Sequence, residues 1–549
     1  MPGGKGYLSK HICLILATTV GPVIVTGLSK RSTGVSRIMK LRGLFLSLMA
    51  LLVLGIAACV AWWYIRLMPV APDQYHVRGK FGPVINWPLV PLQVLTLPDG
   101  RLMSYGSDAK GRQSGMEIYD VWDPQKGVGP ESHLTLPNKT GTDLFCSGQI
   151  ILPADQSVLL VGGDRTVNGR RNWSSADVNT FSYANNQITS TGKTMASPRW
   201  YPTVATLSNG DVVVLGGRLD PTHFAPVPEI FSPGKGWMVL NGATSDEAYG
   251  SENWDYPRAW QSKRGDMVII SGTGDTFSLN LEGQGHVQKL NLRLPDAHPD
   301  VPSLMYAPGK ILSLRNKGIT YKVDINGEQP VATKLQWFGM ARHYASATVM
   351  ADGSVFINGG GLRNNSEKHH ILANRVAMIW DPRTESLVMA AAAQKDRLYH
   401  STSLLLPDAT VFTGGGGAAH PLAENQLNAE IYHPPYLFKK DGSGDLAPRP
   451  VIRNAPNFAS WGHQFKVDVP GKVSRMTLVK LGSSTHVQVF DQRFLDLKFK
   501  KSGESDYAVT APDDSKVAPP GYYFLFAFDQ DGVPSIAKII KLEATGLTS

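Results

Sequence analysis

A pattern of paired apolar segments recurs seven times between about residues 88 and 417. In each copy an apolar segment leads into a turn rich in Asp, Asn or Gly, and a second apolar segment follows, usually ending in paired glycines. This pattern is typical of a β-hairpin, because such strands flank a turn that needs residues tolerant of positive φ. The copies begin at Leu92, Ser147, Tyr201, Tyr256, Val301, His343 and Tyr399.

The spacing of these hairpins predicts how they pack. Their turns lie roughly 43 to 56 residues apart, which is the range of propeller blades. Hairpins at this period bury their apolar faces by packing radially around an axis. We therefore expect a seven-bladed β-propeller over residues 88–446, with paired glycines that resemble kelch repeats. The alternative, an array of β-sandwiches, would not give such regular spacing.

After Leu446 the pattern stops and short strands follow, such as QFKVDV, RMTLVKL and YYFLFAFD, separated by Pro and Gly turns. This predicts an immunoglobulin-like β-sandwich over residues 447–549. The chain is thus expected to be all-β.

The segment Leu44–Met68 is almost wholly apolar and long enough to span a bilayer. Lys40 and Arg42 precede it, so the positive-inside rule places residues 1–43 in the cytoplasm and the body outside the cell membrane, after a linker over residues 69–87. The alternative is a cleaved signal peptide, and Met39 is a possible true start.

The net charge of +9 is concentrated at the N-terminus. The first 68 residues hold eight of the 54 basic residues and no acidic ones, which leaves 46 basic against 45 acidic residues in the body. The body therefore has no electrostatic footprint for nucleic acid.

The three cysteines are Cys13, Cys59 and Cys146, and only the last lies in the predicted extracytoplasmic body. An internal disulfide is excluded there, and an unpaired thiol in an oxidising compartment is a liability unless it is buried or chemically occupied. The sequence has no Walker loop, no HExxH and no Gly-x-Ser-x-Gly motif.

Several chemically active residues stand at the start of predicted first strands, which point towards the propeller axis. Each alone is more often a core or hydrogen-bonding residue than a ligand. Two imidazoles combined with phenolate oxygens, however, favour Cu(II) over zinc or calcium. The candidates are Cys146, Tyr201, Tyr399, His400 and, in the terminal domain, His486.

Four segments that contain these residues resemble the galactose oxidase and glyoxal oxidase family of copper radical oxidases. They are DLFCSGQIILPADQSVLLVGGD, PRWYPTVATLSNGDVVVLGG, RLYHSTSLLLPDATVFTGGGG and GSSTHVQVFDQR. The similarity runs from about residue 88 to the C-terminus, and the four segments occur in the family's order.

The resemblance implies one copper ion and a radical cofactor made by a thioether between Cys146 and Tyr201. Tyr201, His400 and His486 would be equatorial ligands, and Tyr399 the axial ligand and base. The implied reaction is a two-electron oxidation of a primary alcohol or aldehyde hydrate, with O₂ reduced to hydrogen peroxide.

The chain departs from the family at the tryptophan that stacks on the radical tyrosine, since residues 219–226 contain no Trp. Trp254 and Trp260 are candidates for this role. The sugar-contacting residues of galactose oxidase have no convincing match, so a small alcohol, an aldehyde or the end of a glycan is the expected substrate. The alternatives are a non-catalytic kelch propeller that binds a glycan or protein, and a glycosidase, for which no pair of carboxylates is evident.

Overall fold

The computed structural model describes residues 44–57, 68–250, 255–295, 300–336, 338–339, 341–362, 373–418 and 424–544. The chain divides into two units, Met1–Arg66 and Leu67–Ser549. Strands dominate the described residues, which confirms the predicted all-β class.

In the first unit, residues 44–57 form a helix that covers the start of the predicted membrane segment. Residues 58–67 of that segment lie outside the described residues. Among the helices that the structure does describe, none has both the length and the apolar character needed to cross a bilayer.

The described part of the second unit contains seven consecutive antiparallel sheets between Lys80 and His433. The first three are built from β3 (Gln93–Thr96), β4 (Leu102–Ser107), β5 (Gln113–Ser114), β6 (Ile118–Trp122) and β7 (His133–Pro137); β8 (Gly148–Ile151), β9 (Val158–Val161), β10 (Asp164–Val167), β11 (Arg170–Ser182) and β12 (Gln187–Arg199); β13 (Thr203–Thr206), β14 (Val212–Leu215), β15 (Glu229–Ser232) and β16 (Gly236–Val239). The next three are built from β17 (Arg258–Gln261), β18 (Met267–Ile270), β19 (Asp275–Asn280) and β20 (His286–Arg293); β21 (Ser303–Ala307), β22 (Lys310–Leu314), β23 (Thr320–Asp324) and β24 (Val331–Lys334); β25 (His343–Val349), β26 (Val355–Gly361), β27 (Val376–Asp381) and β28 (Ser386–Ala392). The last contains β29 (Ser401–Leu405), β30 (Val411–Gly415) and β31 (Asn428–His433) together with β1 (Lys80–Phe81) and β2 (Ile85–Asn86).

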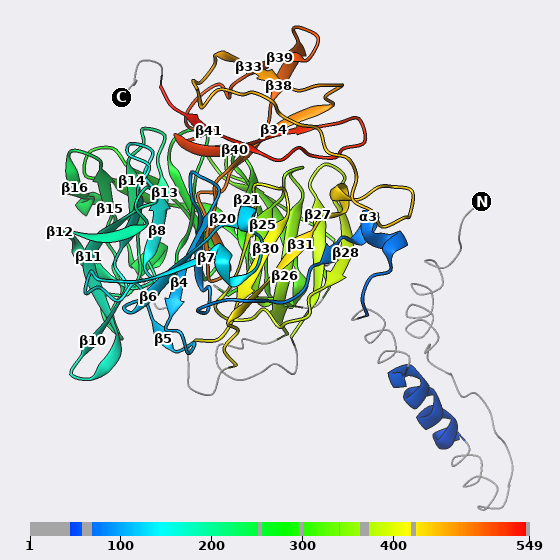
Figure 1. Ribbon diagram of the computed structural model, residues 1–549. Coiled ribbons are helices and arrows are strands. Elements are labelled where there is room, and N and C mark those ends of the chain that lie inside the picture. Colours follow the sequence, from blue (N-terminus) through cyan, green and yellow to red (C-terminus); the bar gives the residue numbers. More distant parts are fainter. Residues whose placement is uncertain are drawn as a thin grey trace, which may run out of the picture. The chain divides into compact units, whose positions relative to one another are not determined.

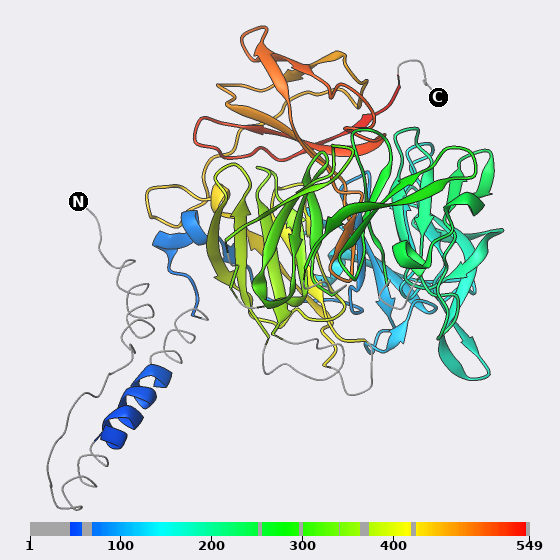
Figure 2. The same cartoon turned by 180° about the vertical axis from the view of Figure 1, so that it is seen from behind.

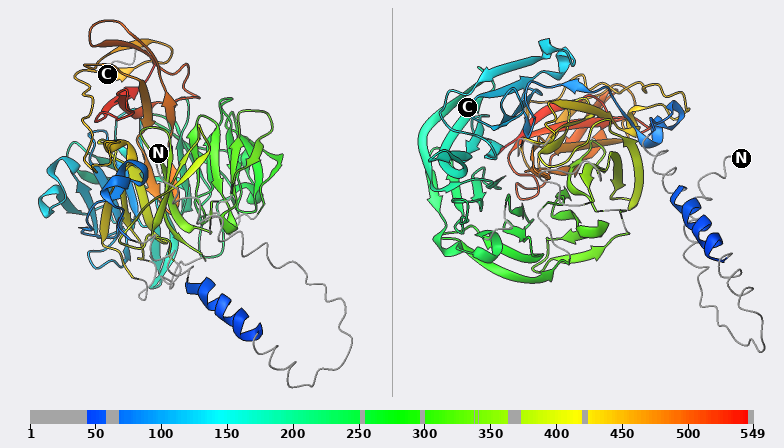
Figure 3. Two further views of the ribbon diagram at one scale, coloured as in Figure 1. Left: turned by 90° about the vertical axis from the view of Figure 1, so that its right-hand side faces the viewer. Right: turned by 90° about the horizontal axis from the view of Figure 1, so that it is seen from below.

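These sheets follow one another around a ring in chain order (Figure 3, right). Each predicted hairpin corresponds to the first two strands of one sheet. Strands such as β14 are buried on both faces because neighbouring sheets cover them, which explains their continuous apolar sequence. The last sheet is completed by β1 and β2 from the start of the unit, which pair with β31 and join the two ends of the ring.

The C-terminal residues form two further sheets, which stand at one end of the ring (Figures 1 and 2). Their strands are β32 (Phe458–Ala459), β33 (Gln464–Asp468), β34 (Arg475–Lys480), β37 (Phe494–Asp496), β38 (Lys498–Lys501), β39 (Asp506–Thr510), β40 (Gly521–Phe528) and β41 (Lys538–Leu542). The short helices of the second unit are η1 (Pro72–Gln74), α3 (Tyr75–Arg78), η2 (Pro124–Lys126), η3 (Pro130–Ser132), η4 (Asn241–Ala243), η5 (Asp246–Gly250), η6 (Asn316–Gly318) and η8 (Pro435–Leu437).

One hairpin leaves the C-terminal sheets and enters the middle of the ring. Its strands are β35 (Ser483–Thr485) and β36 (Gln488–Phe490), and β35 pairs with the innermost strand β3. The hairpin also contacts the first strands β13, β21, β25 and β29 of four other sheets. Contact with so many first strands places it on the axis, where residues from distant sheets converge.

Candidate active site

The turns that lead into the first strands of four sheets line the inner rim of the ring, the end of these strands nearest the axis. Each turn holds one residue in the left-handed backbone conformation: Cys146, Tyr201, Tyr256 and His400. Their φ angles are 57°, 65°, 56° and 68°. The Tyr201 N–H donates to the Cys146 carbonyl (3.0 Å), and the Tyr256 N–H donates to the Tyr201 carbonyl (2.9 Å). Non-glycine residues in this conformation cost on the order of 1–3 kcal/mol each and persist only where the surroundings impose it. The neighbouring sheets thus fix one another at the rim.

His486 occupies the tip of the axial hairpin. Thr485 and Gln488 pair across the hairpin, so its loop is His486 and Val487, and both have positive φ (41° and 61°). Two-residue loops of this kind normally contain Asn or Gly. A β-branched valine there is strained, and the turn aims the preceding imidazole into the centre of the rim.

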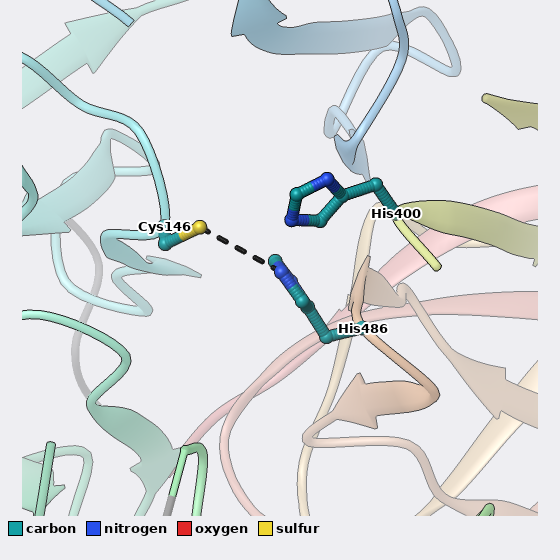
Figure 4. Close-up of side chains that lie close together, drawn as sticks. All are labelled: Cys146, His400 and His486. Atoms are coloured by element: carbon teal, nitrogen blue, oxygen red, sulfur yellow. Dashed lines mark hydrogen bonds between the residues drawn. The ribbon is translucent and has the colours of Figure 1, made fainter. Parts of the chain in front are cut away.

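The five candidate residues meet in one buried cluster. The Tyr201 and Tyr399 hydroxyls are 2.9 Å apart, and Cys146 Sγ lies 3.6 Å from His486 Nε2 (Figure 4). The His400 and His486 ring centroids are 4.5 Å apart. One ligand atom each from Cys146, His400 and His486 lies within 4.8 Å of the other two. The five residues come from four separate turns of the chain, because Tyr399 and His400 are adjacent.

Both histidines have one nitrogen engaged and the other directed towards the cluster. His400 Nδ1 donates to the Gly417 carbonyl, and its buried Nε2 has no hydrogen-bond partner among the described residues. His486 Nδ1 lies 2.6 Å from Thr485 Oγ1. Burial lowers the pKa of His400 to about 3 and that of His486 well below its usual range. Neutral imidazoles held through Nδ1 are suited to bind a metal through Nε2.

The Cys146 thiol and the Tyr201 phenol are buried, and the Tyr399 phenol is partly buried. Burial raises the pKa of Tyr201, Tyr399 and Cys146 well above their ordinary values. The Cys146 thiol also makes a hydrogen bond with the Tyr201 side chain. Two imidazole nitrogens and two phenol oxygens form a donor set that fits Cu(II), and a cation there would favour the phenolates that burial disfavours.

Two buried ion pairs hold the tyrosines in place, and the sequence did not predict them. Arg199 Nη2 lies 2.9 Å from Glu229, and its Nη1 donates to the Gly216 carbonyl (2.8 Å). Arg397 Nη2 lies 3.0 Å from Glu430 in the equivalent arrangement. The repeated Arg-x-Tyr spacing at Arg199, Arg342 and Arg397 is the signal that could have revealed the arginines.

Of the two candidates for the stacking tryptophan, only Trp260 is among the described residues, and it does not belong to the hydrophobic cluster that contains Tyr201. Trp254 lies outside the described residues. Trp260 packs in a different hydrophobic cluster, with Val268 and Met305. Besides the His486 imidazole, two described aromatic rings pack against Tyr201: the adjacent Trp200, with centroids 4.4 Å apart at 47°, and Tyr256, at 5.2 Å and nearly perpendicular.

Comparisons with known proteins agree on one family. Residues 449–542 match the family model of the galactose oxidase-like early set domain. The chain is 29% identical to galactose oxidase from Gibberella zeae, in an alignment that covers 84% of this chain and 70% of that protein. It is 25% identical to aldehyde oxidase GLOX1 from Arabidopsis thaliana, over 64% of each chain.

Among solved structures, the fold is similar to that of a fungal alcohol oxidase of the AA5 family in complex with copper. The TM-score is 0.75 with 24% sequence identity, and the match covers 84% of this chain and 99% of the other. The relatives, the family model that matches the C-terminal residues and the fold all show similarity to galactose oxidase and its family.

Proposed function

We propose that the protein is a copper radical oxidase that converts a primary alcohol or aldehyde hydrate to the two-electron-oxidised product and O₂ to hydrogen peroxide. The observation that carries this proposal is the buried cluster of two tyrosines, two neutral histidines and one cysteine at the axis. The relatives support it, because they are a galactose oxidase, an aldehyde oxidase and an alcohol oxidase in complex with copper.

Each residue of the cluster has a role in this proposal. Tyr201, Tyr399, His400 and His486 hold one copper ion, which when bound supplies Lewis acidity and accepts one electron. Cys146 forms a thioether with the Tyr201 ring, so that Tyr201 can hold a radical. Tyr399 takes the substrate hydroxyl proton, and the Tyr201 oxygen takes a hydrogen atom from the substrate carbon. Reduction of O₂ by two electrons and two protons restores the site.

The proposal also includes a seven-bladed propeller and a C-terminal sandwich as the domains that carry the site. Seven sheets in the described residues, arranged in a ring, support a seven-bladed propeller of the kelch type over residues 88–446. The two sheets formed after residue 447 support an immunoglobulin-like sandwich that supplies His486.

We also propose that the N-terminal segment anchors the protein in the cell membrane with the enzymatic body outside. Apolar side chains of the helix over residues 44–57 are about half exposed or more, for example Leu46 at 68% and Leu54 at 65%. Such a surface needs a lipid or protein partner. The concentration of positive charge before this helix gives the orientation.

A non-catalytic binding module is the weaker alternative. A propeller that only displays loops has no need for two neutral histidines whose Nε2 atoms face two phenols and a thiol. The substrate class remains broad within the proposal: small alcohols, aldehydes or the end of a glycan.

The proposal is tested by measuring peroxide from copper-loaded protein supplied with glycolaldehyde, methylglyoxal, glyoxal, galactose and oligosaccharides. We expect one peroxide per O₂ consumed with at least one of them, and no peroxide from His400→Ala. Arg453→Ala, in the C-terminal sheets, serves as the control. Protein that binds one copper ion per chain but produces no peroxide from any of these compounds would overturn the proposal.

A further inference from the structure

Arg218 lies beside the cluster and has no role in the chemistry described above. It follows the glycines at the end of β14, and its backbone pairs with that of Trp200 in both directions (3.0 and 2.6 Å). A second bridge joins it to Phe224. The Trp200 ring centroid lies 4.4 Å from that of Tyr201. Since the Arg218 backbone pairs with Trp200, Arg218 is held beside the residue that packs on the proposed radical tyrosine.

The Arg218 guanidinium is fixed by an aromatic pair and a carboxylate. Its central carbon lies 5.8 Å from the Trp200 ring centroid and 5.1 Å from that of Phe224. Nε and Nη2 donate to the two oxygens of Asp255 at 2.9 and 3.1 Å, a bidentate arrangement. The side chains are 25% and 36% exposed, so this Arg–Asp pair is ordered by its contacts and still reaches solvent.

One aromatic ring separates the Arg–Asp pair from Tyr201. The Arg218 guanidinium carbon lies 5.8 Å from the Trp200 ring centroid, which is 4.4 Å from that of Tyr201. Asp255 also directly precedes Tyr256, whose backbone N–H bonds to the Tyr201 carbonyl. A molecule with one hydroxyl at the cluster can therefore present a neighbouring group to the pair.

The hydrogen-bonding groups of Arg218 and Asp255 determine which chemical group of a substrate they can bind. Asp255 uses two of the five guanidinium N–H groups, and Nη1 donates to no described residue. The carboxylate oxygens can accept further hydrogen bonds. An anionic substrate would meet the Asp255 charge, whereas a neutral hydroxyl can donate to the carboxylate and accept from the guanidinium.

We propose that Arg218 and Asp255 form a subsite for the second hydroxyl of a neutral vicinal diol, positioning the adjacent primary hydroxyl at Tyr201 and Tyr399. The preferred substrates are then polyols, hydrated hydroxyaldehydes or sugar ends, and not simple alcohols or carboxylates. This inference rests on the proposed oxidase function for its catalytic consequence, but not for binding.

The kinetic test compares glycerol with 1,3-propanediol, which has the same primary hydroxyl but lacks the neighbouring one. We expect the wild type to have the higher kcat/KM for glycerol. Arg218→Leu should reduce the glycerol-to-propanediol ratio about tenfold or more, as for a lost hydrogen bond to a charged group, and Arg218→Lys should restore part of it. Arg453→Leu is the matched control, because Arg453 makes an equivalent bidentate pair with Asp468 away from the site.

A binding measurement separates this inference from the oxidase proposal. Saturation-transfer NMR on the copper-free full chain should give a stronger signal for glycerol than for 1,3-propanediol, and Arg218→Leu should remove the difference while the melting temperature stays near that of Arg453→Leu. Equal signals in the wild type, or an unchanged ratio in Arg218→Leu, would overturn the diol subsite. Glycerol preference in binding, with no peroxide from glycerol, 1,3-propanediol or any of the aldehydes and sugars named under the proposed function, would overturn the oxidase proposal alone.

Discussion

At the scale of single residues, the candidate site is marked by backbone conformations that its sequence does not favour. Cys146, Tyr201, His400 and His486 all have positive φ, where Gly or Asn would be expected. Side chains of this chemistry in strained positions indicate that placement of the functional groups outweighs local stability. At the cluster, the residue types are therefore determined by function more than by local backbone preference.

Cys146→Ser tests the thioether at this scale. Because the four proposed nitrogen and oxygen ligands remain, we expect the variant to keep its fold and most of its copper binding. Without the sulfur link Tyr201 loses its stabilised radical, so peroxide production should fall on the order of a hundredfold or more. Cys59→Ser, in the N-terminal segment, is the matched control. Full peroxide production by Cys146→Ser would contradict the radical role of Tyr201.

The residues of the cluster could be predicted from sequence, but their supports could not. Cys146, Tyr201 and the Tyr399–His400 pair stand at repeated positions in segments that resemble a known family. Glu229 could not be predicted, because its partnership with Arg199 depends on how strands β12 and β15 approach in space. The position of Arg218 at the proposed subsite could not be predicted either, since its contacts come from three separate segments of the chain.

At the scale of elements, the axial hairpin β35–β36 connects the C-terminal sheets to the cluster. At its base Lys480 and Asp491 form a buried ion pair. Asp491 also accepts hydrogen bonds from the Thr206 N–H (3.1 Å) and hydroxyl (2.6 Å) in β13. The pair thus fixes the hairpin that presents His486 against the third sheet.

Lys480→Met should leave Asp491 as an uncompensated buried charge and lower the free energy of unfolding by about 3–5 kcal/mol. The double variant Lys480→Met with Asp491→Leu should lose less than the single one, because no charge is left buried. Urea unfolding measures both changes. Lys466→Met, which breaks an exposed pair with Asp506, should cost about 0–1 kcal/mol. Equal costs for Lys480→Met and Lys466→Met would contradict the role of the buried Lys480–Asp491 pair in fixing the hairpin.

The hairpins could be predicted from the alternation of apolar segments and turns, but not their final pairing. The register between β3 and β35 joins Gln93 to Thr485, at opposite ends of the second unit. The closure of the last sheet by β1, which pairs Lys80 with His433, is also a contact between segments far apart in the sequence. Neither follows from local periodicity, because each strand would be compatible with many partners.

At the scale of the whole molecule, an apolar N-terminal helix accompanies a nearly neutral enzymatic body. The proposed anchor predicts that the full chain stays with the membrane fraction after a high-salt wash, because its attachment is hydrophobic and not ionic. A chain that lacks residues 1–68 should move to the soluble fraction and keep its peroxide production. A full chain that is soluble, or whose isolated N-terminus begins after residue 59, would contradict the anchor.

The proposed radical chemistry depends on a bond between the Cys146 and Tyr201 side chains, which the fold brings together. The most direct measurement is peptide mass spectrometry of copper-loaded, aerated protein, with protein never exposed to copper as the control. We predict that the Cys146 and Tyr201 peptides are recovered from the loaded sample as one species, two hydrogen atoms lighter than their sum. The two hydrogens and their electrons pass to O₂. Recovery of two separate, unmodified peptides after loading would contradict the Cys146–Tyr201 thioether and the radical cofactor that depends on it.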